Sequence, residues 1–238
     1  MIYYTNLYAF EVHKEVSHMS LEIENRPLLV LLGGFNTQIM RDASWVKHFL
    51  FPLVKQDEIT VNMGISLLND EISSSMTIDD IRVDVGPGKI QITPSDLSLS
   101  KLDAIVDLIK NMASALPHTP LSAYGINFRF IEKLDKAVLK ENSLLSMLFH
   151  NIPIPDSIKL EQQIKYDKSL MTFSLTENYD NGMPTLSYDF NFHFAIKSGE
   201  LASMTLLKES IMDGDIEKYQ TKAKSIAEGI SSSLASLG

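Results

Sequence analysis

The sequence contains no cysteine, and this absence removes several kinds of chemistry at once. Without a thiol there is no disulfide, no thiolate ligand for a metal and no cysteine nucleophile. A zinc site would then need roughly three or four converging histidines and carboxylates. The six histidines are scattered singly along the chain. We therefore expect neither a metal nor a cofactor.

Clusters of lysine and arginine are also missing. The 238 residues carry 21 basic and 30 acidic side chains, which gives a net charge of -9. A protein that grips nucleic acid through its phosphates usually presents a basic face, so we expect no nucleic-acid partner. An acidic balance of this kind commonly serves solubility, and a basic partner is the alternative.

Long apolar runs are absent as well. The longest, such as residues 27–32, are far too short to cross a bilayer. The first residues lack the basic segment and apolar core of a signal peptide. No Asn-x-Ser/Thr sequon occurs. These features favour a cytoplasmic protein that does not enter a membrane.

What the sequence does contain is a segment, residues 185–197, in which apolar and polar side chains alternate. Successive side chains of a strand point to opposite faces, so the apolar residues share one face and the polar residues share the other. The pattern predicts a long strand with one face on the core and the other towards water. The apolar face comprises Leu186, Tyr188, Phe190, Phe192, Phe194 and Ile196.

Other segments with period-two alternation or short apolar runs predict further strands. The residues Gly86, Pro87 and Gly88 predict a hairpin turn between two of these strands. Turn formers at 167–168 and 180–182 join the last three strands into a meander. The expected strands cover residues 2–12, 27–32, 59–68, 76–85, 89–93, 122–130, 158–166, 170–179 and 185–197.

Apolar residues at helical spacing predict helices over 100–116, 134–149 and 216–234, with a short helix after Asp42 and a partly helical segment at 201–212. Asp42 is a plausible N-cap for the short helix. Ser100 and Asp103 resemble a capping box at the start of the first long helix.

Together these elements predict the α+β class. We expect a largely antiparallel sheet of roughly six to eight strands, with long amphipathic helices packed on one face. The chain would form a single domain of residues 1–238. A meander followed by a long helix occurs twice, which suggests two similar βββα halves, residues 1–133 and 134–238.

Known catalytic motifs are not evident in the sequence. Gly33 and Gly34 follow a strand but lack the spacing of a dinucleotide fingerprint. The segment 86–89 lacks the upstream glycine and the following Ser or Thr of a P-loop. No Gly-x-Ser-x-Gly elbow and no His-Glu-x-x-His helix occurs, so a non-enzyme is favoured over an enzyme.

The best candidate constellation lies on the polar side of the alternating strand. Asp189, Asn191 and His193 share that face, and Asn127 and Arg129 share the polar side of another strand that pairing could bring alongside. His193 would be a general base, with Asp189, Asn191 and Arg129 as the other catalytic candidates. Asn127, Arg129, Asp189 and His193 are the candidate binding residues. The competing interpretation, a solvated polar sheet face, is favoured because half-exposed antiparallel sheets commonly carry such residues.

An acidic cluster, Asp79, Asp80 and Asp84, lies near a predicted strand. Asp80 and Asp84 would share a face, where a divalent cation could bind. Arg82 lies between them and would neutralise part of the charge. A solvated strand edge that resists pairing is the favoured interpretation.

A meander closed by a long C-terminal amphipathic helix is similar to helix-grip ligand-binding domains, over roughly the last third of the chain. This resemblance implies an apolar pocket between the helix stripe and Phe190, Phe192 and Phe194.

Three functions follow from these patterns. The leading hypothesis is a non-catalytic interaction or assembly subunit of an intracellular complex, which binds a protein partner or itself and leaves its interior densely packed. The second is the apolar-ligand domain of the helix-grip type. The third is an enzyme that uses the polar sheet face around His193, which would then lie in a cleft.

Overall fold

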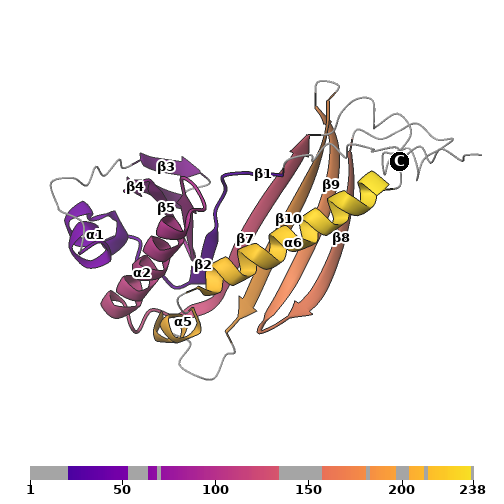
Figure 1. The fold of residues 1–238 in the computed structure, drawn as a ribbon. Helices are drawn as coiled ribbons and strands as arrows, with labels where there is room; N and C mark the ends of the chain where they lie inside the picture. The colour runs from indigo at the N-terminus through magenta and orange to yellow at the C-terminus, as the bar shows by residue number, and fades with distance from the viewer. Residues whose placement is uncertain are drawn as a thin grey trace, which may run out of the picture.

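The computed structural model describes residues 21–52, 64–68, 71–133, 157–180, 183–196, 204–211 and 214–236. These residues form a ten-stranded sheet together with several helices (Figure 1). Every strand pairs antiparallel to its neighbours. The α+β class with a large antiparallel sheet is therefore confirmed, and the sheet has more strands than the roughly six to eight expected.

The strands follow the order β3-β4-β5-β6-β2-β7-β10-β9-β8, and β1 pairs with β7 off this path. The central strand β7 therefore joins a short-stranded side to a long-stranded meander. The bounds are β1 Glu22–Ile23, β2 Leu29–Gly33, β3 Gly64–Leu68, β4 Glu71–Ile78, β5 Ile81–Gly86, β6 Lys89–Pro94, β7 Leu121–Lys133, β8 Ser157–Tyr166, β9 Ser169–Asp180 and β10 Met183–Ala195.

One of the extra strands arises because the segment 76–85, expected to be a single strand, turns back on itself. Asp79 and Asp80 have φ angles of 48° and 60° and connect β4 to β5. Aspartate tolerates this left-handed conformation better than most residues, so two of them can form a tight hairpin turn. The sequence pattern predicted that Asp80 and Asp84 share a strand face. This prediction is wrong, because Asp80 lies in the turn and not in a strand. The Asp-Asp pair lacks the glycine that usually marks such a turn.

The hairpin turn predicted at residues 86–88 forms as expected. Gly86 pairs with Lys89, and Pro87 and Gly88 make the turn between β5 and β6. Gly88 has a φ of 69°, which its lack of a side chain permits.

Strand β2 is followed by the helices η1 and α1. In α1 (Ala43–Leu50), the carboxylate of Asp42 accepts hydrogen bonds from the backbone N–H groups of Ser44 at 2.9 Å and Trp45 at 3.2 Å. The predicted N-cap is thus confirmed. Asp42 directly follows the 3-10 helix η1 (Ile39–Arg41).

The long helix α2 (Leu99–Ala115) begins before the expected capping box. Its N-cap residue is Ser98, which makes no side-chain cap hydrogen bond. The carboxylate of Asp96 accepts a hydrogen bond from the backbone N–H of Ser98 at 2.8 Å and so sets the chain direction just before the helix. The prediction of a box at Ser100 and Asp103 is therefore wrong.

The C-terminal segment forms α5 (Met204–Ser210) and α6 (Asp215–Ser236). Figure 1 shows α6, in yellow, running across the long strands, with α2 beside the short-stranded side. The ring centroid of Tyr219 lies 4.9 Å from that of Phe192 and 5.4 Å from that of Phe194. Ala223 and Ala227 are also buried, which lets the helix backbone approach the aromatic strand.

The aromatic alternation of β10 forms the centre of the core. Leu186, Tyr188, Phe190, Phe192 and Phe194 each expose 7% of their surface or less. Each large buried side chain contributes about 2 kcal/mol before conformational entropy is subtracted. Ring contacts extend from β10 to both neighbours. They are edge-to-face, stacked or tilted and join the pairs Phe128–Phe192, Phe130–Phe190, Tyr124–Phe194 and Phe173–Phe190.

Several expectations lie outside the described residues. They are the strand at 2–12, the first half of the strand at 59–68 and the helix at 134–149. The division into two similar halves and the single domain stay predictions. Among the described helices, none combines the length and apolar character that a bilayer span requires.

Candidate functional site

The pairing of β7 with β10 brings most of the candidate residues together. Arg129 lies opposite Asp189, and Asn127 lies opposite Asn191. These side chains project from the sheet face opposite the aromatic core, because they alternate with buried phenylalanines on both strands. The alternation in the sequence predicted which residues share a face, and the pairing of β7 with β10 shows which of them are neighbours.

A bulge beside β7 adds two residues to this group, Glu24 and Arg26. Neither was a candidate from the sequence. Ile23 pairs with Phe130 and Leu29 pairs with Ile126, so residues 24–28 face only residues 127–129. The backbone still pairs at both ends, through Glu24 N–H to Arg129 O at 3.0 Å and Asn127 N–H to Leu28 O at 2.7 Å. The extra residues interrupt the regular pairing, and a bulge of this kind re-aims the side chains that it carries. We call residues 24–28 the bulge.

Four charged side chains at the bulge form what we call the ion network: Glu24, Arg26, Arg129 and Asp189. Arg129 holds the carboxylate of Asp189 with two hydrogen bonds, from Nε at 2.6 Å and Nη2 at 3.0 Å. Its Nη1 donates to Glu24 Oε2 at 3.0 Å. Arg26 Nη1 also donates to Asp189. The two positive and two negative charges balance.

The surroundings of Arg129 act on its pKa in opposite directions. Partial burial lowers the pKa of the guanidinium, and the hydrogen bonds and charges of Asp189 and Glu24 raise it by more. The net pKa is raised, so Arg129 stays a cation and its paired geometry is favoured.

An amide ladder continues from the ion network along the same face. Asn191 Nδ2 donates to Asn127 Oδ1, and Asn127 Nδ2 donates to the backbone oxygen of Pro27 at 3.2 Å. A Cβ atom on Gly125 would meet Asn191 Nδ2 at 3.2 Å, so this glycine leaves room for the ladder. The amides thereby tie the bulge to β7 and β10.

His193 lies beyond this group. It pairs with Gly125 on one side and Leu170 on the other. It is four residues from Asp189 along β10, which corresponds to about 14 Å in a strand. The carboxylate of Asp189 is bound to Arg26 and Arg129. The structure thus separates the proposed base from the proposed carboxylate, and a catalytic role for His193 stays a prediction.

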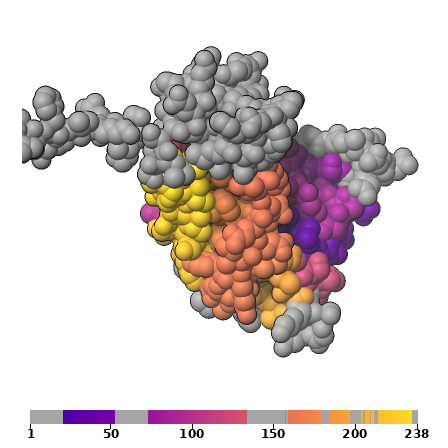
Figure 2. Space-filling view, turned by 90° about the vertical axis from the view of Figure 1, so that its right-hand side faces the viewer, coloured from indigo at the N-terminus to yellow at the C-terminus, as the bar shows by residue number. Residues whose placement is uncertain are grey.

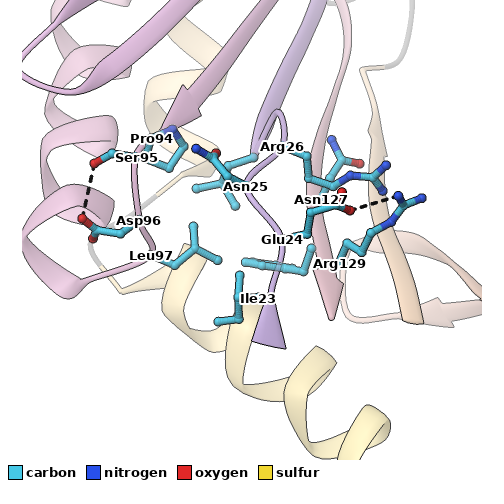
Figure 3. Close-up of a pocket in the computed structure, with 12 residues that line it drawn as sticks. Ile23, Glu24, Asn25, Arg26, Pro94, Ser95, Asp96, Leu97, Asn127 and Arg129 are labelled. Carbon is cyan, nitrogen blue, oxygen red and sulfur yellow. Dashed lines mark hydrogen bonds and ion pairs between the residues drawn. The ribbon is translucent and has the colours of Figure 1, made fainter. Parts of the chain in front are cut away.

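Two hollows flank the bulge. The first, the bulge pocket, encloses about 280 Å³ between the segment 94–97 on one side and Glu24 and Arg129 on the other (Figure 3). Its walls include the apolar side chains of Ile23, Leu28 and Leu97. The second, about 270 Å³, is a hollow on the open sheet face. Arg26 and Asn127 line both.

The acidic cluster at the β4–β5 hairpin does not converge on a common point. Lys101 Nζ donates to the backbone oxygen of Asp79 at 2.7 Å and lies 3.5 Å from its carboxylate. Asp84 pairs instead with Arg82 at 2.9 Å. Within the described ranges, no three His, Asp or Glu side chains gather as a metal site would require.

The outer edge of the sheet carries a further surface that the sequence analysis did not identify. Strand β8 is the last in the order, and in the described part of the chain no strand pairs with its outer side. Leu160 and Ile164 expose 43% and 41% of their surface on the same sheet face as the aromatic core. Figure 2 shows β8 and β9, in orange, forming an open surface beside α6 in yellow.

The open face of β8 is charged. Lys159 Nζ lies 2.6 Å from Glu161 Oε2, and Ser174 Oγ of β9 donates to the same oxygen at 3.1 Å. These hydrogen bonds, first that from Lys159 and then that from Ser174, lower the pKa of the Glu161 carboxyl. Lys165 follows on the same face. The edge therefore combines exposed apolar residues on one face with charges of both signs on the other.

Comparison with known proteins gives no relative to which function could be compared, because no protein-family model matches the chain and no curated protein matches it.

Proposed function

We propose that the protein is a non-catalytic interaction subunit that binds another protein chain along strand β8. The observation that carries this proposal is the ten-residue strand β8, whose outer side pairs with no strand among the described residues and which leaves Leu160 and Ile164 exposed. A bare strand edge offers backbone donors and acceptors to a further strand, and such edges are ordinarily protected or used. A partner strand would also cover the two apolar side chains.

The interior packing supports an interaction subunit over an apolar-ligand domain. A helix-grip pocket would lie between α6 and the aromatic residues of β10. Tyr219 occupies that position and contacts Phe192, Phe194 and Tyr166 at ring-centroid distances of 4.9, 5.4 and 5.9 Å. Dense ring contacts of this kind leave little space for a ligand.

The open sheet face supports a structural use of its polar residues. In the ion network, every charged group contacts one of opposite sign, and the amides bind each other or the backbone. A catalytic acid or base needs a pKa suited to proton transfer and access to a reacting group. A satisfied network instead holds the bulge and the two central strands together.

The test compares an edge variant with a matched control. Leu160→Lys places a charge on the exposed edge, whereas Leu170→Lys changes a residue of similar exposure, 42% against 43%, on the opposite face of β9. The tagged full-length chain, expressed in its native host, should elute in a complex larger than its 26.7 kDa, in wild type and in Leu170→Lys. Leu160→Lys should elute as a monomer with an unchanged melting temperature.

Two outcomes contradict the proposal. One is a wild-type chain that elutes at its monomer mass from the native host. The other is a complex that survives Leu160→Lys and remains intact in the second edge variant, Ile164→Lys.

A further inference from the structure

Resting on the proposed function, we infer that the chain bound along β8 is a second copy of this protein. The two β8 strands pair antiparallel about a two-fold axis that passes beside Gln163. The sheets of the two copies then join into one, and both aromatic cores lie on the same face. This assigns both the partner and the register of the edge.

The charges of β8 are complementary to those of its own reversed sequence. With Gln163 on the axis, Glu161 lies opposite the partner's Lys165, and the symmetry repeats this pair. Side chains directly opposite in an antiparallel pair are about 5 Å apart at Cβ, close enough for opposite charges to stabilise the pairing. Glu161 then lies between its own Lys159 and a second lysine, and its carboxylate has a lowered pKa that keeps it ionised.

The apolar face fits the same register. Leu160 lies opposite the partner's Tyr166 and diagonal to the partner's Ile164, within reach of long side chains across a strand pair. Both exposed apolar residues of the edge therefore gain an apolar neighbour, and each does so twice by symmetry. The helices α6 of the two copies lie on this same face, on either side of the joint.

Neighbouring registers of the two β8 strands are less favourable, either because like charges face each other or because residues are left without a partner. An axis at Gln162 places Lys159 opposite the partner's Lys165, and an axis at Glu161 places two glutamates face to face. Like charges directly opposite destabilise a strand pair. An axis at Leu160 does place Lys159 opposite the partner's Glu161, but it leaves Ile164 and Lys165 without an opposite residue in the described strand. Of these four axes, only the one at Gln163 uses every exposed apolar and charged residue from 160 to 166.

Charge reversals in the full-length chain test the register. The measurement is the dimer dissociation constant by sedimentation velocity over a concentration series. Glu161→Lys and Lys165→Glu alone should each weaken the dimer by roughly tenfold or more, because each turns two attractive pairs into repulsive ones. The double variant should restore most of the affinity. Lys159→Glu combined with Glu161→Lys should not.

The melting temperature of each variant, measured at a concentration where all are monomeric, separates loss of the dimer from loss of the fold. Rescue by Lys159→Glu in place of Lys165→Glu overturns the register. A wild-type chain that stays monomeric over the whole series overturns the second copy as partner. If Leu160→Lys nevertheless releases a different bound chain in the native host, the interaction function stands without the dimer.

Discussion

Glu132 and Tyr188 place a carboxylate and a phenol in the interior of the protein, where each exposes 2% of its surface or less. The Tyr188 hydroxyl donates to Glu132 Oε2 at 2.6 Å, and Ser231 Oγ of α6 donates to Oε1 at 2.8 Å. Burial, and then the hydrogen bond and charge of Glu132, raise the pKa of the Tyr188 phenol, so it remains protonated and able to donate. The network ties β7 and β10 to the C-terminal helix.

Tyr188→Phe removes one of these donors and keeps the ring. The free energy of unfolding should fall by roughly 1–3 kcal/mol, the cost of leaving a buried acceptor unsatisfied. Urea unfolding followed by circular dichroism measures it. The control is Tyr219→Phe, which loses a 3.3 Å hydrogen bond to the exposed Asp167 and should cost less. Equal losses in the two variants would contradict the assigned role of Glu132.

Asp167, in the β8–β9 turn, responds to pH through a different contact. The hydrogen bond from Lys218, at 2.8 Å, lowers the pKa of its carboxyl below the ordinary 3.8. A depressed folded-state pKa contributes stability above the unfolded pKa, and this contribution is lost as pH falls through the folded value. NMR titration should place the Asp167 midpoint below 3.8, and Lys218→Met should move it upwards. An unchanged midpoint would exclude the contact in solution.

The strand β10 and the helix α6 illustrate how an element depends on its neighbours. Phe192 is fully buried, with 0% of its surface exposed, and contacts Phe128, Tyr166 and Tyr219. Its burial depends on both the sheet and the helix that crosses it. A charge at this position would lie among rings without a partner.

Phe192→Asp should therefore prevent folding to a soluble protein, whereas Phe192→Leu should fold with a free energy of unfolding lower by roughly 1–3 kcal/mol. Soluble expression and thermal melting measure the two outcomes. A soluble Phe192→Asp variant that melts cooperatively would mean that this face of β10 is not the core face.

The whole molecule is organised around β7, which pairs with β2 and β1 on one edge and with β10 on the other. The short-stranded and long-stranded sides therefore share a strand and a continuous sheet. If that connection makes the two sides one cooperative unit, a destabilising substitution on one side should lower the melting temperature measured by a probe on the other side.

The single tryptophan provides the reporter, because Trp45 lies in α1 on the short-stranded side. Phe192→Leu, on the long-stranded side, should lower the melting temperature reported by Trp45 fluorescence as much as that reported by circular dichroism. The expected shift is roughly 2–12 °C for a change of this size. Two separated transitions would show that the chain unfolds as two domains.

Features that depend on residues close together in the chain could be predicted from the sequence alone. Alternation defined β10 and its buried face, and the proline and two glycines at 86–88 defined a turn. Asp42 was recognisable as an N-cap because its hydrogen bonds reach only two and three residues ahead. The shared face of Asn127 and Arg129 followed from the same period of two.

Which strands are neighbours, and therefore which residues form the candidate sites, depends on pairing between distant segments. The bulge is invisible in the sequence because it is a mismatch in length between residues 24–28 and the distant residues 127–129. The exposed edge at β8 could not be predicted either, because the strand order, and not the residues of the strand itself, places β8 at the edge of the sheet. Local patterns specify the conformation of a segment, whereas pairing energies between distant segments specify what each side chain meets.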